Sequence, residues 1–254
     1  MLGEQWADGL GTGLGDLVGF DVRMAYYAPF LNAVVAQGGD GLDHLPGDVQ
    51  DMITQWAGLL EPMPDDVAQG YATVPIRMII DRIAKRRRLN RLMLRTFVAV
   101  FFREVAAYMR DGAGHHAARD AVADAIAAHR AQVVIAHSLG SVVAYEALWH
   151  RPELEVELLV TLGSPLGMPG VIFERLRPAP GERGERPPGV RHWINIADVG
   201  DIIAIPRPFT RRFTPDANYE ETIGLLDFHT ASGYLAHRRT LAALSGHLQG
   251  PSNG

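Results

Sequence analysis

The chain of 254 residues contains no cysteine. This absence excludes disulfides, thiolate metal sites and a cysteine nucleophile, and it is typical of a reducing compartment, so we expect a cytoplasmic protein. Lysine is nearly absent as well, since the sequence contains one lysine, Lys85, and 23 arginines. No stretch reaches the roughly 18 apolar residues that a membrane span requires, and we expect no integral membrane association.

The charge balance argues against a nucleic-acid partner. A formal charge of −5 gives the whole chain no excess of positive charge, which nucleic-acid-binding domains usually carry. Hydrophobic residues make up 47% of the chain and charged residues 21%, which is enough apolar material for a sizeable core. We therefore expect a soluble globular protein.

Strands and helices alternate over the second half of the chain. Short apolar runs predict buried strands at 132–136, 156–162 and 190–196. Helical spacing of apolar residues predicts helices at 115–130 and 140–150. Strands joined through helical crossovers form parallel sheets, so the expected fold class is α/β, with a mostly parallel sheet flanked by helices.

The first half of the chain is expected to be largely helical. We predict a short helix at 3–17, an alternating strand at 20–27, and a helix from the N-cap Asp48 to residue 60. Apolar residues then recur at helical spacing over 75–110, as two helices or one bent helix with a break near residues 89–90.

These elements predict one domain over residues 1–254, with a helical insertion or cap at about 48–110 and a flexible tail at about 247–254. The basic run Lys85–Arg91 falls within the insertion. We expect it to be a solvated helix face, and the alternative is a cap helix that attracts an anionic substrate or membrane surface.

The segment Ala136-His-Ser-Leu-Gly140 follows a predicted buried strand and precedes a predicted helix. It matches the G-x-S-x-G nucleophile elbow with alanine at the first glycine. In this sharp turn the hydroxyl of Ser138 is exposed, and the amide of Leu139 faces a developing oxyanion. The alternative is that Ser138 only caps the following helix.

Two further segments carry a family resemblance. Residues 161–167 read TLGSPLG, and residues 195–206 read NIADVGDIIAIP. Together with the elbow they resemble the lipase-like branch of the α/β-hydrolase superfamily over roughly residues 115–240. The resemblance implies an α/β-hydrolase-like fold and a lipase-like serine esterase that uses a catalytic triad.

The resemblance also assigns roles to individual residues. It places the nucleophile at Ser138, the acid at Asp201 and the base at His229, in the chain order that this fold uses. Asp198 is the alternative acid, because it also follows the strand at 190–196. His237 is the alternative base, although a histidine inside the following helix is more typical of a surface.

The expected activity is hydrolysis of a carboxylic ester or related small acyl substrate through an acyl-enzyme on Ser138. One alternative is an acyltransferase or lactone-forming cyclase on the same fold. The other is a non-catalytic binding or scaffold protein that keeps the elbow. The other histidines show no metal-ligand spacing with carboxylates, so we expect no metal and no cofactor.

The sequence departs from the family at its beginning. Chains of the lipase-like branch open with a strand that ends in His-Gly, and the following loop supplies the second oxyanion donor. We expect this segment to be missing here, which would impair hydrolysis. A sheet without its opening strand also has an open edge that invites pairing, which predicts a homodimer.

Overall fold

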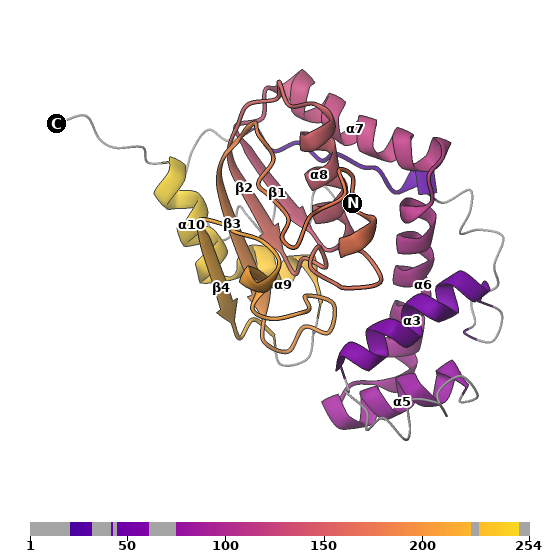
Figure 1. The fold of residues 1–254 in the computed structure, drawn as a ribbon. Helices are drawn as coiled ribbons and strands as arrows, with labels where there is room; N and C mark the ends of the chain where they lie inside the picture. Colours follow the sequence, from indigo (N-terminus) through magenta and orange to yellow (C-terminus); the bar gives the residue numbers. More distant parts are fainter. Residues whose placement is uncertain (1–20, 32–41, 43–44, 61–74, 225–228, 249–254) are drawn as a thin grey trace. The chain divides into compact units, whose positions relative to one another are not determined.

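Four strands form a parallel sheet in the computed structural model, which describes residues 21–31, 42, 45–60, 75–224 and 229–248. The strands are β1 (Val133–His137), β2 (Val156–Leu162), β3 (Val190–Asp198) and β4 (Ala217–Glu221), and they lie in the order β1-β2-β3-β4. Figure 1 shows them side by side. Parallel strands end at the same edge of a sheet, so the carboxyl ends of all four lie together.

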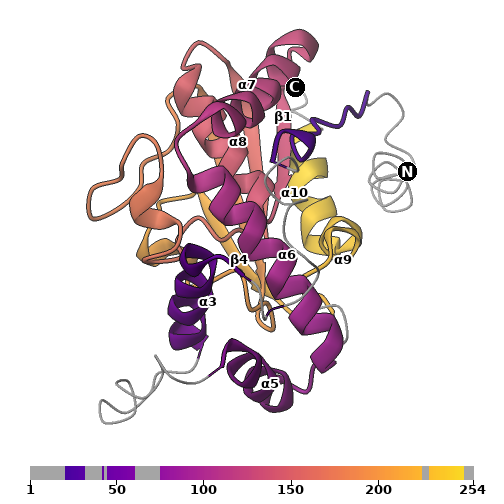
Figure 2. The ribbon, with the colours of Figure 1, turned by 90° about the vertical axis from the view of Figure 1, so that its right-hand side faces the viewer.

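Helices cover both faces of this sheet. α8 (Leu139–His150) follows β1, and its Tyr145 ring lies 5.9 Å from the ring of Trp193 on one face. α9 (Ala231–Ala236) and α10 (Arg238–Leu248) cover the other face, where Leu235 and Leu244 pack with alternate residues of β2. The views in Figures 1 and 2 agree on this layering. The predicted α/β class is therefore confirmed at this level.

Contacts divide the chain into two compact units. One unit comprises residues 1–26, 120–167 and 180–254, and it contains the sheet. The other comprises residues 27–119 and 168–179. The predicted insertion at about 48–110 falls within the second unit, and α7 (Ala113–His129) begins there and continues into the first.

The second unit is built on three helices, α3 (Gly47–Leu60), α5 (Ile76–Arg87) and α6 (Arg91–Met109). α3 and α5 each contact α6. Between α3 and α6 the ring centroids of Trp56 and Phe102 lie 5.4 Å apart. The break predicted near residues 89–90 is present, and it separates two helices. The N-cap prediction for Asp48 is wrong, because α3 begins one residue earlier and Asp48 lies in its first turn.

Where another predicted element is present in the structure, its boundaries lie within two residues of the observed ones. One predicted strand is absent, because residues 21–27 have no regular secondary structure. The predicted helix at 3–17 and the tail beyond residue 248 lie outside the described residues, and α10 extends into the start of the predicted tail.

Among the described strands, β1 has a partner on one side only, which is β2. The homodimer remains a prediction. In the part of the chain that the structure describes, no helix combines the length and the apolarity needed to cross a membrane.

Candidate functional site

Ser138 lies in a strained turn between β1 and α8. Its φ of 54° and ψ of −134° place it in a region that residues other than glycine rarely adopt. Three hydrogen bonds to two segments, the end of β2 and the first turn of α8, hold this turn. The Ser138 amide donates to the Leu162 carbonyl at 3.0 Å, and the Ser138 carbonyl accepts from the amide and hydroxyl of Ser141 at 2.9 and 2.6 Å. The sharp turn predicted from Ala136–Gly140 is thus present.

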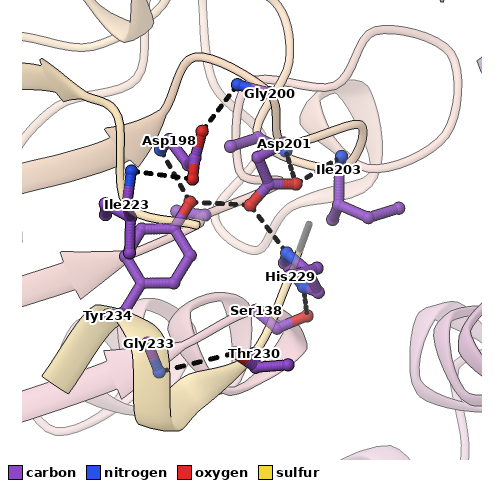
Figure 3. A network of polar contacts seen from close by, with 12 residues as sticks. Ser138, Asp198, Gly200, Asp201, Ile203, Ile223, His229, Thr230, Gly233 and Tyr234 are labelled. Carbon is purple, nitrogen blue, oxygen red and sulfur yellow. Dashed lines mark hydrogen bonds and ion pairs between the residues drawn. The ribbon is translucent and has the colours of Figure 1, made fainter. Parts of the chain in front are cut away.

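The hydroxyl of Ser138 does not cap α8, since it makes no capping hydrogen bond. It lies 2.6 Å from Nε2 of His229 (Figure 3). His229 directly precedes Thr230, whose side chain caps α9 by accepting from the Gly233 amide at 3.4 Å. The beginning of α9 therefore brings His229 to the carboxyl end of β1.

The other ring nitrogen of His229, Nδ1, lies 2.7 Å from Oδ2 of Asp201. An ionised carboxylate only accepts hydrogen bonds, so Nδ1 carries the proton and Nε2 is left to accept from the Ser138 hydroxyl. The three side chains form one hydrogen-bonded chain in the order Ser138, His229, Asp201. Serine and histidine are thereby arranged for proton transfer between Oγ and Nε2.

Asp201 is completely buried, and its carboxylate accepts four hydrogen bonds. Oδ1 accepts from the amides of Ile203 and Ala204 at 2.7 and 3.2 Å, and Oδ2 accepts from His229 and the Tyr234 hydroxyl at 2.7 Å each. Burial by itself raises the pKa of this carboxyl. The charge and hydrogen bonds of His229, Tyr234 and Ile203 outweigh burial, so the pKa lies below its ordinary value.

Asp198, the alternative acid, has a different role. Its Oδ1 accepts from the Gly200 amide at 2.6 Å, and its Oδ2 accepts from the amides of Ile223 and Gly224 at 3.0 and 2.9 Å. These bonds tie the turn after β3 to the segment after β4. Figure 3 shows the Tyr234 hydroxyl between the two aspartates, accepting from the Asp198 amide and donating to Asp201.

His237, the alternative base, lies between α9 and α10 and not inside a helix. It is the C-cap of α9, and its Nδ1 accepts from the Arg239 amide at 3.3 Å. This bond satisfies an amide at the beginning of α10. The structure thus brings His229, and not His237, to Ser138.

His137 packs against the site from within the elbow. Its ring centroid lies 4.7 Å from that of His229 and 5.5 Å from that of Tyr234. Its Nε2 is buried without a hydrogen-bond partner among the described residues. Burial, and then the charge of His229, lower the pKa of His137 to about 3. The ring is therefore neutral at physiological pH.

The segment at 161–167 begins at the end of β2, beside the site. Gly163 has a φ of +54°, and a Cβ atom there would lie 2.9 Å from Oδ2 of Asp201 and 3.0 Å from the Tyr234 ring. Ser164 is 3% exposed, and its hydroxyl lies 2.7 Å from that of Ser141. This pair joins the turn after β2 to the first turn of α8.

The sequence did not single out Tyr234, Ser141 or Ser164. Tyr234 lies in α9, five residues after His229, but nothing in its local pattern indicates a bond to a distant aspartate. The two serines meet across 23 residues of sequence, and only the parallel pairing of β1 with β2 brings them together.

Within the described residues, no group of three or more histidine, aspartate or glutamate side chains could hold a metal ion. Comparisons with protein-family models, with curated proteins and with solved structures give no match to this chain.

We expect Gly163→Ala to lower the free energy of unfolding by about 2–4 kcal/mol, because a left-handed backbone and a close contact with Asp201 both oppose a Cβ atom. Gly58→Ala, at an unobstructed position within α3, should instead stabilise the protein by about 0.5–1 kcal/mol. Urea denaturation measures both changes. An alanine at 163 that leaves stability unchanged would contradict the packing described for this turn.

His137, which is half-buried with its Nε2 in the interior, should make stability pH-dependent. In the unfolded chain a histidine binds a proton near pH 6.5, but native His137 does so only near pH 3. Unfolding therefore takes up a proton between these values, and stability should fall by up to about 1.4 kcal/mol per pH unit as pH drops below 6.5. His137→Phe should remove this contribution, as measured by urea denaturation at several pH values.

His129→Phe, at an exposed position at the end of α7, is the matched control and should keep the wild-type slope. If the free energy of unfolding changes equally with pH in the wild type and in His137→Phe, His137 accepts a proton readily in the native protein.

Proposed function

We propose that this protein is a serine hydrolase of the lipase-like α/β-hydrolase type, acting on a carboxylic ester through an acyl-enzyme on Ser138. The observation that carries the proposal is the chain Ser138 Oγ–His229 Nε2–Nδ1–Asp201 Oδ2, with its serine on a strained strand-to-helix turn. A serine that only capped a helix would need neither the strain nor the buried histidine and carboxylate.

In the first half-reaction His229 takes the hydroxyl proton on Nε2 while Oγ attacks the carbonyl carbon of the ester. The tetrahedral intermediate collapses, the bond from acyl carbon to alkoxy oxygen breaks, and His229 gives its proton to the departing alcohol. In the second half, water attacks the acyl-enzyme with the same proton transfers, and the carboxylic acid leaves. Asp201 remains ionised, which its lowered pKa favours, and stabilises the imidazolium.

The oxyanion donor in this proposal is the amide of Leu139, which directly follows the nucleophile. The first amides of a helix have no acceptor within the helix, and the helix dipole favours negative charge there. Both features apply to Leu139, the first residue of α8. A second donor typically contributes about 100- to 1000-fold in turnover.

The proposal predicts that a fluorophosphonate probe forms one adduct, on Ser138, because only an activated serine attacks phosphorus at neutral pH. Intact mass and peptide mapping detect it. The wild type and Ser245→Ala, a control in α10, should be labelled, and Ser138→Ala should not. An unlabelled Ser138 in folded protein would favour the non-catalytic binding or scaffold protein.

The two aspartates should differ in their effect on catalysis. Asp201→Asn should lower kcat/KM for a p-nitrophenyl ester by about 10⁴-fold, because an amide stabilises the wrong histidine tautomer. Asp198→Asn should retain activity within about tenfold, since this side chain bonds only backbone amides. Circular dichroism checks that both variants fold. Equal losses in the two folded variants would contradict the assignment of the acid.

A further inference from the structure

Positive charge is concentrated in the helical hairpin of the second unit. Residues 76–95 contain eight basic side chains and one acidic side chain, a formal charge of +7 in a chain whose total is −5. The rest of the chain thus carries −12. The single carboxylate in this range is that of Asp81, and it accepts a hydrogen bond from Arg95 Nε at 2.7 Å. Asp81 therefore pairs with an arginine that lies outside the turn between α5 and α6.

The turn between α5 and α6 is well defined. The Arg88 backbone is left-handed with a φ of 57°, and its amide donates to the Lys85 carbonyl at 3.3 Å. The next amide, of Leu89, donates to the Ala84 carbonyl at 2.8 Å, which completes a Schellman motif. Asn90 then caps α6 by accepting from two amides of its first turn. The flanking side chains are therefore presented from a fixed backbone.

Basic and apolar side chains are exposed together at this turn. We define the hairpin tip as residues 85–88 and 91–93, all of which are exposed. Its basic members are Lys85, Arg86, Arg87, Arg88 and Arg91. Leu92 is 71% exposed and Met93 is 61% exposed, both in the first turn of α6. Figure 2 shows α5 and α6 joined at this turn.

We propose that the hairpin tip binds the surface of an anionic lipid bilayer. Its five cationic side chains match a layer of headgroup phosphates, and Leu92 and Met93 can enter the boundary between headgroups and acyl chains. A single-stranded nucleic acid would fit the charge but not the apolar side chains, and the tip offers no aromatic ring on which a base could stack. This interaction goes beyond the proposed chemistry and does not depend on it.

Sedimentation with vesicles tests the proposal on the full chain. Vesicles of phosphatidylglycerol and phosphatidylcholine in equal amounts should bind the protein, and vesicles of phosphatidylcholine alone should not. Each basic side chain near an anionic surface strengthens binding by about fivefold. Arg87→Gln with Arg91→Gln should therefore weaken binding by about 30-fold.

The matched control is Arg130→Gln with Arg238→Gln, which removes the same charge from exposed positions outside the hairpin. It should bind within about twofold of wild type. Leu92→Ser with Met93→Ser should weaken binding by about tenfold through lost apolar contact. Circular dichroism confirms the folding of each variant.

Four results would overturn the proposal. The first is no binding to the anionic vesicles at low salt, and the second is an equal loss in the two arginine pairs. The third is unchanged binding by the Leu92 and Met93 variant, which would exclude insertion. Tighter binding to a single-stranded oligonucleotide than to the vesicles, abolished by Arg87→Gln with Arg91→Gln, would assign the tip to nucleic acid instead.

Discussion

The site depends on the hydrogen bond between the buried Asp201 carboxylate and His229. A buried carboxylate is costly unless hydrogen bonds replace the water it loses. Asp201 accepts four, two from the turn that follows it and two from side chains of the segment at 229–234. The carboxylate therefore stabilises its own turn and joins β3 to the start of α9. Loss of His229 or Tyr234 would leave this buried charge with fewer partners.

Local features of the sequence predicted the elbow, and long-range contacts decided the rest of the site. Ser138 could be identified because the strand, the small residues and the helix around it are neighbours in sequence. Asp198 and Asp201 could not be separated in this way, since Asp198 ends β3 and Asp201 lies only three residues further on. What separates them is the amides of Ile223 and Gly224, which lie about 25 residues further along the chain and engage Asp198.

The same distinction holds for the fold. The strands β1, β2 and β3 are rich in β-branched and aliphatic residues, so their sequences predict them. β4 reads ANYEE and escaped prediction, because its pairing with β3 and not its composition makes it a strand. Residues 21–27 show the converse, since they alternate like a strand but have no regular secondary structure.

Three described residues other than glycine have positive φ, and the hydrogen bonds that this backbone conformation permits differ among them. Arg88 and Arg130 end helices, where a left-handed residue lets amides pair with the last carbonyls. Arg88 and Arg130 have similar backbone geometry, so the left-handed backbone of Arg88 does not set the hairpin tip apart from the end of α7. The high density of positive charge around Arg88 does. Ser138 begins a helix, so helix termination does not explain its strain. The bond from its hydroxyl to His229 supplies a reason, because this turn aims Oγ at the ring.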